Sequence, residues 1–256
     1  MLILLSPAKS LNEAPVSKDI STSAPRLGKE TETLLKVAKK LKSADLKALM
    51  GISDNLAELN RARFAHFDDQ AVTPAAMLFD GDVYTGLKAR ELDAGGLDFA
   101  QQHVRILSGL YGVLRPLDGI RPYRLEMGTS LKTAKGNSLY AFWGERIATQ
   151  LSEDAKSAGT DTVLNLASQE YARAALTKGL KLRVVNVKFL EIKGDKTQMI
   201  SFFAKKARGL MARYVIDNRI TNPEAAKGFD YEGYRFVPEA SDDKQWTFSR
   251  KHPNAA

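Results

Sequence analysis

The sequence predicts a mixed α/β (α+β) fold, in which a mixed sheet and surrounding helices form a single domain. The 256 residues are 44% hydrophobic and 27% charged, which is typical of a globular protein with a sizeable core. Helix-like and strand-like segments are mixed along the chain without a regular βαβ order. No internal repeat, low-complexity tract or linker divides it, so we expect one domain over residues 1–251 and a frayed tail at 252–256.

The first strand and the first helix are indicated by their hydrophobic patterns. Residues 2–5 are all apolar and stop at Ser6 and Pro7, as in a buried strand that ends in a turn. Over residues 30–42 apolar positions recur at helical spacing, with acidic residues first and lysines last, which suits the helix dipole. The polar segment 12–28 between them is expected to be a surface excursion.

Further elements follow from the same rules. Residues 43–67 are predicted to form two helices, and another helix is expected to start at Thr73 and Pro74. Gly81 and Asp82 indicate a turn beside a strand. The remaining helices are predicted at 98–104, 138–156 and 202–219, and the remaining strands at 162–166, 182–192, 231–237 and 246–250.

The composition excludes several kinds of chemistry. The chain has no cysteine, which removes disulfides, Cys-ligated zinc, iron–sulfur clusters and thiol nucleophiles. Its three histidines, His66, His103 and His252, lie far apart in the sequence, so we predict neither a metal site nor a cofactor. Only about four consecutive apolar residues follow Met1, too few for a signal peptide or a membrane span. We therefore expect a cytoplasmic protein without a membrane partner, and we expect a monomer.

The charge balance favours an anionic partner. A net charge of +8 attracts polyanions, of which nucleic acid is the most abundant. Segments 103–128 and 200–219 concentrate Arg, Lys and Tyr residues. In the first, glycines let the backbone turn tightly while guanidinium groups can hold phosphate or carboxylate. The alternative for this segment is that its arginines pair with carboxylates at the edge of the core and its glycines only build turns.

The helix predicted at 202–219 has a core face and a basic side when its residues are placed about 100° apart. The core face is predicted to contain Phe203, Ala207, Leu210, Met211 and Tyr214. On the other side Lys205, Gly209 and Ala212 form a narrow stripe, to which the backbone of a strand, a loop or a nucleic acid could lie close. The residues expected to hold DNA phosphate are Lys205, Lys206, Arg208 and Arg213. A solvated basic face is the alternative.

The helix pair at 43–67 resembles a helix-hairpin-helix element. Its short connection contains Gly51, and a hairpin of this kind offers backbone N–H groups to a DNA phosphate at a helix N-terminus. Ser53 stands where the motif usually has a second glycine, and a plain pair of packed helices would show much the same pattern. The DNA contacts predicted here are Lys47, Gly51, Ile52, Ser53, Arg61 and Arg63.

A second class of function is an enzyme that acts on a phosphorylated or nucleotide-like small molecule. Ser6 and Lys9 follow the first strand, where α/β proteins often place ligand-binding residues. The candidate anion pocket contains Ser6, Lys9, Arg115, Arg121 and Arg124. The candidate catalytic residues are Tyr84, Tyr111 and Glu126. The two classes are distinguished by whether residues from 6–9, 84–86, 111–126 and 205–208 line one cavity.

Five sequence segments together carry a family resemblance. They are LLSPAKSL, GDVYTGL, LSGLYGVLRPLDGIRPYRLEMG, NLASQEY and ISFFAKKARGLMARYVIDNR. Their combination runs from the first residues to about Phe236 and resembles the YaaA family of peroxide stress resistance proteins.

The resemblance implies a single mixed α/β domain of unusual topology and a cytosolic location. It also implies a role in limiting damage when hydrogen peroxide and free iron meet, and DNA binding through a helix-hairpin-helix-like element and a basic cleft. Because the chain has no cysteine and no histidine cluster, we do not expect protection by direct peroxide reduction or by tight iron chelation with soft ligands.

Overall fold

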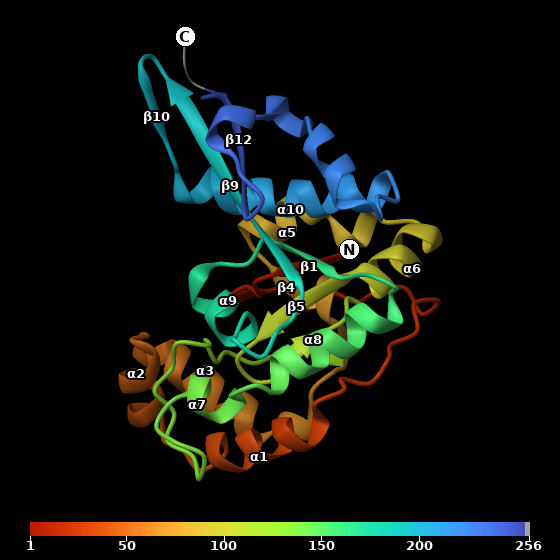
Figure 1. The fold of residues 1–256 in the computed structure, drawn as a ribbon. Helices are drawn as coiled ribbons and strands as arrows, with labels where there is room; N and C mark the ends of the chain where they lie inside the picture. The colour runs from red at the N-terminus through yellow and green to blue at the C-terminus, as the bar shows by residue number, and fades with distance from the viewer. Residues whose placement is uncertain (254–256) are drawn as a thin grey trace.

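The computed structural model describes residues 1–253 and is built around one eight-stranded mixed sheet (Figure 1). The strands are β1 (Leu2–Leu5), β5 (Val104–Ser108), β6 (Gly112–Leu114), β8 (Thr162–Asn165), β9 (Arg183–Lys193), β10 (Lys196–Gln198), β11 (Arg235–Phe236) and β12 (Gln245–Lys251). Their order is β11-β12-β9-β8-β1-β5-β6, with β10 paired to β9. Neighbours from β12 to β5 are parallel, whereas β6, β10 and β11 are antiparallel to their partners. The predicted single-domain fold with a mixed sheet is confirmed.

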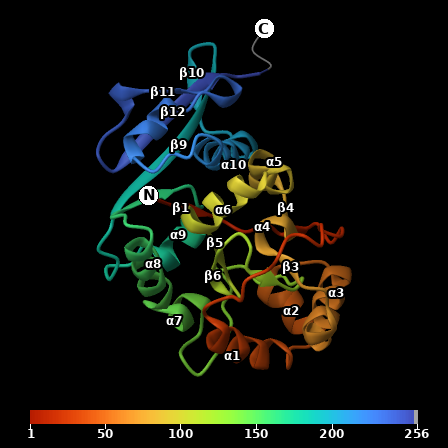
Figure 2. The same cartoon turned by 90° about the vertical axis from the view of Figure 1, so that its right-hand side faces the viewer.

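Helices surround this sheet. Within residues 1–253 they are α1 (Gly28–Ala38), α2 (Ser43–Met50), α3 (Asp54–Ala65), α4 (Ala75–Leu78), α5 (Asp82–Leu87), α6 (Ala94–His103), α7 (Leu139–Trp143), α8 (Arg146–Ser157), α9 (Gln169–Ala175) and α10 (Ser201–Asp217). Two small sheets pair β2 (Ser10–Leu11) with β4 (Phe79–Asp80), and β3 (Thr73–Pro74) with β7 (Gly119–Ile120). In both views α1, α2 and α3 lie at one end of the molecule and β12 lies toward the other, with α10 between β12 and α5 (Figures 1 and 2).

Strand β1 lies in the middle of the parallel part of the sheet. Ile3 is in register with Val104 of β5 on one side and with Leu164 of β8 on the other. All four residues of β1 are buried, which explains its uniformly apolar sequence. The chain passes first to β5 and later to β8, so the strand order reverses at β1. In open α/β sheets, ligands bind beyond the carboxyl ends of the strands at such a reversal.

Helix α10 crosses α5 with the two backbones in contact. A Cβ atom added to Gly209 would lie 1.7 Å from the carbonyl oxygen of Val83, and one added to Gly86 would lie 2.3 Å from that of Lys206. Gly209 and Ala212 are both buried. The small-residue stripe of this helix therefore receives the backbone of a short helix, not that of a strand, a loop or a nucleic acid.

Two predicted helices differ from the structure. Helix α6 begins at Ala94, before the predicted start at Asp98, because the carboxylate of Asp93 accepts a hydrogen bond from the N–H of Gly96 at 2.6 Å. The helix predicted at 138–156 is two helices, α7 and α8, separated at Gly144, whose φ of 50° does not continue a helix.

Two predictions near the C-terminus are also revised. The strand predicted at 231–237 is reduced to Arg235–Phe236, because Glu232 has a left-handed backbone conformation (φ 53°) in a 3-10 turn. At the start of the predicted tail, the N–H of His252 donates to the carbonyl of Ile192 at 2.9 Å. Residues 254–256 of that tail lie outside the described residues. No helix within residues 1–253 is long and apolar enough to cross a membrane.

A buried histidine is expected to make the stability of the protein depend on pH. His103 donates from Nδ1 to the carbonyl of Met1 at 3.0 Å and packs against the ring of Phe99. Burial lowers the pKa of His103 from its usual value, and the hydrogen bond to Met1 opposes part of that shift. The unfolded chain takes up a proton near pH 6.5, whereas the folded protein resists protonation. Stability is therefore lost as the pH falls below about 6.5.

Thermal unfolding between about pH 7.5 and about pH 5.5 checks this expectation. The unfolding temperature should fall less steeply in His103→Gln than in the wild type. His66→Gln is the control for loss of an imidazole, because His66 is exposed. The same pH dependence in the wild type and in His103→Gln would contradict the prediction.

Candidate functional site

A cavity of about 410 Å³ opens at the carboxyl ends of β1 and β8. One wall comes from residues 6–10, which follow β1, and another from residues 168–171, which follow β8 and begin α9. The other walls come from residues 80–83, from Glu126 and from two cations of α10. Segments from five parts of the chain therefore meet at the edge of the sheet where the strand order reverses.

Ser6 connects the loops that follow β1 and β8. Its Oγ accepts a hydrogen bond from the N–H of Ser168 at 2.9 Å and donates to the Oγ of Ser168 at 3.3 Å. The hydroxyl of Tyr84 donates to the carbonyl of Ser6 at 3.0 Å. Burial raises the pKa of Tyr84 well above its usual value, so this phenol stays protonated at neutral pH. Tyr84 therefore holds the backbone of the site and is outside the cavity wall.

Arg208 lines the cavity without a partner. Its half-buried guanidinium group makes no hydrogen bond or ion pair within residues 1–253. Burial lowers the pKa of Arg208 from its usual value. A desolvated charge without a counterion is costly, and a bound anion would remove that cost. The cavity therefore offers a place for an anion at Arg208.

Two lysines also reach the cavity, each near one carboxylate. The Nζ of Lys205 lies 3.8 Å from the Asp82 carboxylate, and the Nζ of Lys9 lies 3.7 Å from the Glu126 carboxylate. The lysine side chains are 52% and 70% exposed, respectively, so these ion pairs contribute little and are easily rearranged. The cavity wall thus has three positive side chains and four carboxylates, those of Asp80, Asp82, Glu126 and Glu170. Among its cations, Arg208 is the unpaired one within the described residues.

Glu126 is the candidate catalytic residue that reaches the cavity wall. Its Oε1 accepts a hydrogen bond from the Nε of Arg124 at 2.9 Å. Its Oε2 is buried and has no hydrogen-bond partner in the part of the chain that the structure describes. This oxygen is therefore an unused acceptor that is shielded from water beside the cavity.

A larger cavity, of about 950 Å³, adjoins the first. The residues common to both are Ser168, Glu170, Lys205 and Arg208. The wall of the larger cavity includes four uncharged amide side chains, those of Asn165, Gln169, Asn186 and Gln245. Arg208 therefore lies at the boundary of two cavities and lines both.

The structure places the other residues of the candidate anion pocket elsewhere. Arg115 lies 2.9 Å from the buried carboxylate of Asp118, so the alternative of a carboxylate pair holds for this arginine. Arg121 lies over the ring of Phe67, 5.8 Å from its centroid. Arg124 borders a small void beside Glu126. It does not line the cavity of about 410 Å³. Only Ser6 and Lys9 of the predicted pocket line the cavity.

Tyr111, the third candidate catalytic residue, belongs to the core. Its hydroxyl accepts a hydrogen bond from the N–H of Arg121 at 3.1 Å, and burial raises the pKa of Tyr111 to about 12. Residues 168–171, in contrast, line the cavity, although their sequence pattern suggests only a helix cap. The Ser168 side chain makes no capping bond and faces Ser6. The signal that identifies these residues is their position after a buried strand, as for residues 6–9.

The predicted DNA contacts fall into two separate groups, one at the connection between α2 and α3 and one on α10, in opposite halves of the molecule (Figures 1 and 2). Gly51 has the left-handed conformation (φ 59°) of a tight turn, Ser53 caps α3, and Ile52 is buried. Most of the predicted cations have partners: the pairs are Lys47–Asp54, Arg61–Glu58, Arg63–Glu13, Lys206–Glu232 and Arg213–Asp217. Such pairs near the surface are weak and leave the cations able to meet phosphate.

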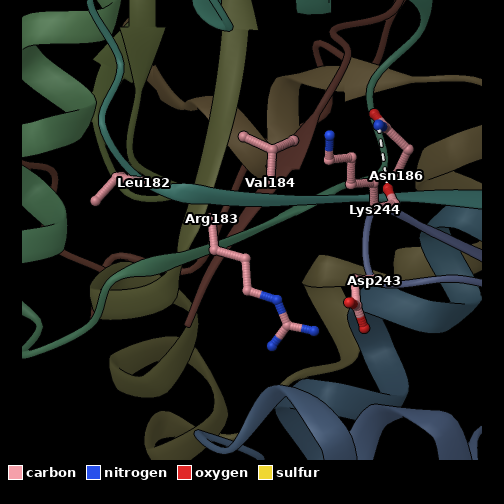
Figure 3. Close-up of a pocket in the computed structure, with 6 residues that line it drawn as sticks. All are labelled: Leu182, Arg183, Val184, Asn186, Asp243 and Lys244. Atoms are coloured by element: carbon pink, nitrogen blue, oxygen red, sulfur yellow. Dashed lines mark hydrogen bonds between the residues drawn. The ribbon is translucent and has the colours of Figure 1, made fainter.

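Other hollows and side-chain groups among the described residues are weaker candidates for a functional site. A hollow of about 760 Å³ lies beside residues 182–186 and 243–244. The amide of Asn186 donates there to the carbonyl of Lys244 (Figure 3). Its Arg183 is paired with Glu224 at 3.1 Å. No group of three or more His, Asp or Glu side chains within residues 1–253 could hold a metal ion. The cavity at Arg208 is the strongest candidate site.

Comparison with known proteins identifies the family. A family model described as peroxide stress protein YaaA matches residues 1–240. The chain belongs to this family. A UPF0246 protein of Caulobacter vibrioides (strain NA1000 / CB15N) is 54% identical over 255 residues, covering 99% of this chain and 100% of the relative. UPF0246 proteins of Phenylobacterium zucineum and Dechloromonas aromatica are 53% and 49% identical, covering 99% and 98% of this chain and 96% and 99% of the relatives.

The resemblance to the YaaA family in five segments is thus confirmed. Each of these segments supplies part of the cavity wall: residues 6–10, residues 81–83, Glu126, residues from 168–171, and Lys205 with Arg208. The family match over residues 1–240 includes the whole wall. The five segments that carry the resemblance therefore converge on one place in the fold.

Proposed function

We propose that this YaaA-family protein serves the peroxide stress response by binding a phosphate-bearing ligand in the cavity at the carboxyl ends of β1 and β8. The observation that carries the proposal is the unpaired, half-buried guanidinium of Arg208 in that cavity. Arginine suits phosphate because its planar fork can donate two parallel hydrogen bonds. Lys205 and Lys9 supply further positive charge, and Ser6 and Ser168 supply hydroxyl groups.

An enzyme with such a cavity would act on a phosphorylated small molecule that is bound in it. Glu126 is the side chain that we assign to proton transfer, because it is the candidate catalytic residue that lines the cavity. In this proposal the protein acts in the cytosol and limits the damage caused by hydrogen peroxide and free iron. No residue of the chain is required to reduce peroxide directly.

Ligand-dependent thermal unfolding tests the binding step. Inorganic pyrophosphate and nucleoside monophosphates are added to the wild-type protein, with sodium chloride of equal ionic strength as the control. A ligand present at about 100 times its Kd stabilises the folded state by about 2.7 kcal/mol, so the unfolding temperature should rise by several degrees. If no phosphate compound raises it above the chloride control, the proposal fails.

We also propose contact with DNA as a second function. Two observations favour it: the net charge of +8, and the left-handed Gly51 turn beside the N-terminus of α3. The first N–H groups of a helix lack acceptors inside the helix and can meet a phosphate. Contact would be made with the backbone and largely without reading sequence.

Salt dependence and charge reversal test the DNA contact. With four phosphates neutralised, affinity for duplex DNA should fall about 100-fold between about 50 and about 200 mM salt. Reversal of Lys205, Lys206 and Arg208 to Glu should weaken binding, as should reversal of Lys47, Arg61 and Arg63. Reversal of Lys156, Lys178 and Lys181, exposed lysines outside both groups, is the control for net charge. Binding that neither salt nor the first two reversals alter would refute the contact.

A further inference from the structure

The larger cavity has amide groups that can form hydrogen bonds with the edge of an uncharged heterocyclic ring. The side chains of Gln169 and Gln245 are exposed and make no hydrogen bond to other residues in the range 1–253. Deeper in the wall, the amide of Asn165 donates to that of Asn186 at 2.8 Å and is thereby fixed. A free amide offers donors and an acceptor without charge, which is how Asn and Gln recognise the edges of nucleobases.

Apolar surface lies beside these amides. Met199 lines the same cavity and is 57% exposed, which is unusual for a large apolar side chain, and Leu176 and Val187 lie in the same wall. A methionine thioether packs favourably against an aromatic ring. Both cavities have charged side chains in their walls, but the wall of the smaller one is the more highly charged, with seven charged residues among fifteen against five among eighteen. A flat uncharged ring would strip more charged groups of water in the smaller cavity. A ring is therefore better accommodated in the larger cavity.

Arg208 lies where the two cavities meet and belongs to both walls. We propose that the site binds a nucleotide, with its phosphate at Arg208 and its base in the larger cavity between Gln169, Gln245 and Met199. This inference rests on the phosphate site proposed above and names the class of its ligand. A phosphate joined through one sugar to a base occurs both in a free mononucleotide and in a nucleic-acid strand. Either source would therefore present the same groups to this site.

Calorimetric titration of the full chain tests whether the base is recognised. Nucleoside 5′-monophosphates are compared with ribose 5-phosphate, which has the same phosphate and sugar but no base. Two hydrogen bonds from the amides, together with ring packing, should make the best nucleotide bind at least about tenfold more tightly than ribose 5-phosphate. A dinucleotide is a further ligand: tighter binding than the mononucleotide would identify a strand as the source, and weaker binding a free nucleotide.

The double variant Gln169→Met, Gln245→Met provides the matched control. Both glutamines are exposed, and methionine keeps their length while removing the amide. In this variant the affinity for ribose 5-phosphate should be unchanged, and the advantage of the nucleotide should be largely lost. Equal binding of nucleotide and ribose 5-phosphate by the wild type would overturn the nucleotide inference but leave the phosphate site standing. No binding of either compound would overturn both.

Discussion

Replacing Gly209 by alanine is expected to destabilise the protein by about 3 kcal/mol or more. The added methyl carbon would lie 1.7 Å from the carbonyl oxygen of Val83, 2.8 Å from the N–H nitrogen of Leu87 and 2.8 Å from the Val83 carbonyl carbon. All three are backbone atoms of α5, so no side chain can rotate away to relieve the overlap. Helices α5 and α10 would have to separate. Urea unfolding of the variant and the wild type measures the difference.

Gly28→Ala is the matched control. Gly28 is the first residue of α1, and a Cβ atom added there meets nothing within 4 Å. Alanine at that position should leave the free energy of unfolding unchanged or raise it by about 0.5–1 kcal/mol. Equal stability of Gly209→Ala and the wild type would contradict the close approach of the two helices. That approach also positions the site, since Asp82 belongs to α5 whereas Lys205 and Arg208 belong to α10.

Replacing Arg208 by methionine is expected to weaken phosphate binding about 10- to 100-fold, because a hydrogen bond to a charged group contributes about 1.5–3 kcal/mol. The stability of the free protein should not fall. Methionine has a similar length and a good helix propensity, and the variant removes a desolvated charge that has no counterion among residues 1–253. Arg208→Met would thus weaken phosphate binding while leaving the free energy of unfolding of the free protein unchanged or higher.

Arg213→Met separates this effect from a loss of net charge. Arg213 lies on the same helix, but its Nε donates to the Asp217 carboxylate at 2.7 Å and it is outside both cavities. Its replacement removes one positive charge, so the affinity for a phosphate compound should change less than about twofold. A loss of affinity as large as that of Arg208→Met would mean that only the overall charge attracts the ligand.

Much of the fold could be predicted where a segment follows one local rule. The strand at residues 2–5 agrees with the structure because an unbroken apolar run is what a strand buried on both faces requires. The helix predicted at 138–156 could not be resolved into two, since its apolar spacing continues across Gly144 and only the backbone shows φ at 50°. Likewise, nothing local reveals that Glu232 interrupts a strand.

The site was only partly predictable because it depends on partners from distant segments. Ser6 and Lys9 could be found from their position after a strand. Arg208 could be recognised as one of several cations on its helix, but periodicity does not show which cation is unpaired. The partners of its neighbours, Asp82 for Lys205 and Glu232 for Lys206, come from other parts of the chain. Pairing over such separations is visible only in three dimensions.

One comparison tests most directly whether this cavity binds phosphate. Wild-type and Arg208→Met protein are titrated with inorganic pyrophosphate, and the unfolding temperature of each free protein is measured. We predict a Kd that is about 10- to 100-fold higher in the variant and an unfolding temperature that is equal or higher. The same Kd in both proteins would contradict a phosphate site at Arg208. A lower unfolding temperature of the variant would contradict the unpaired state of its guanidinium group.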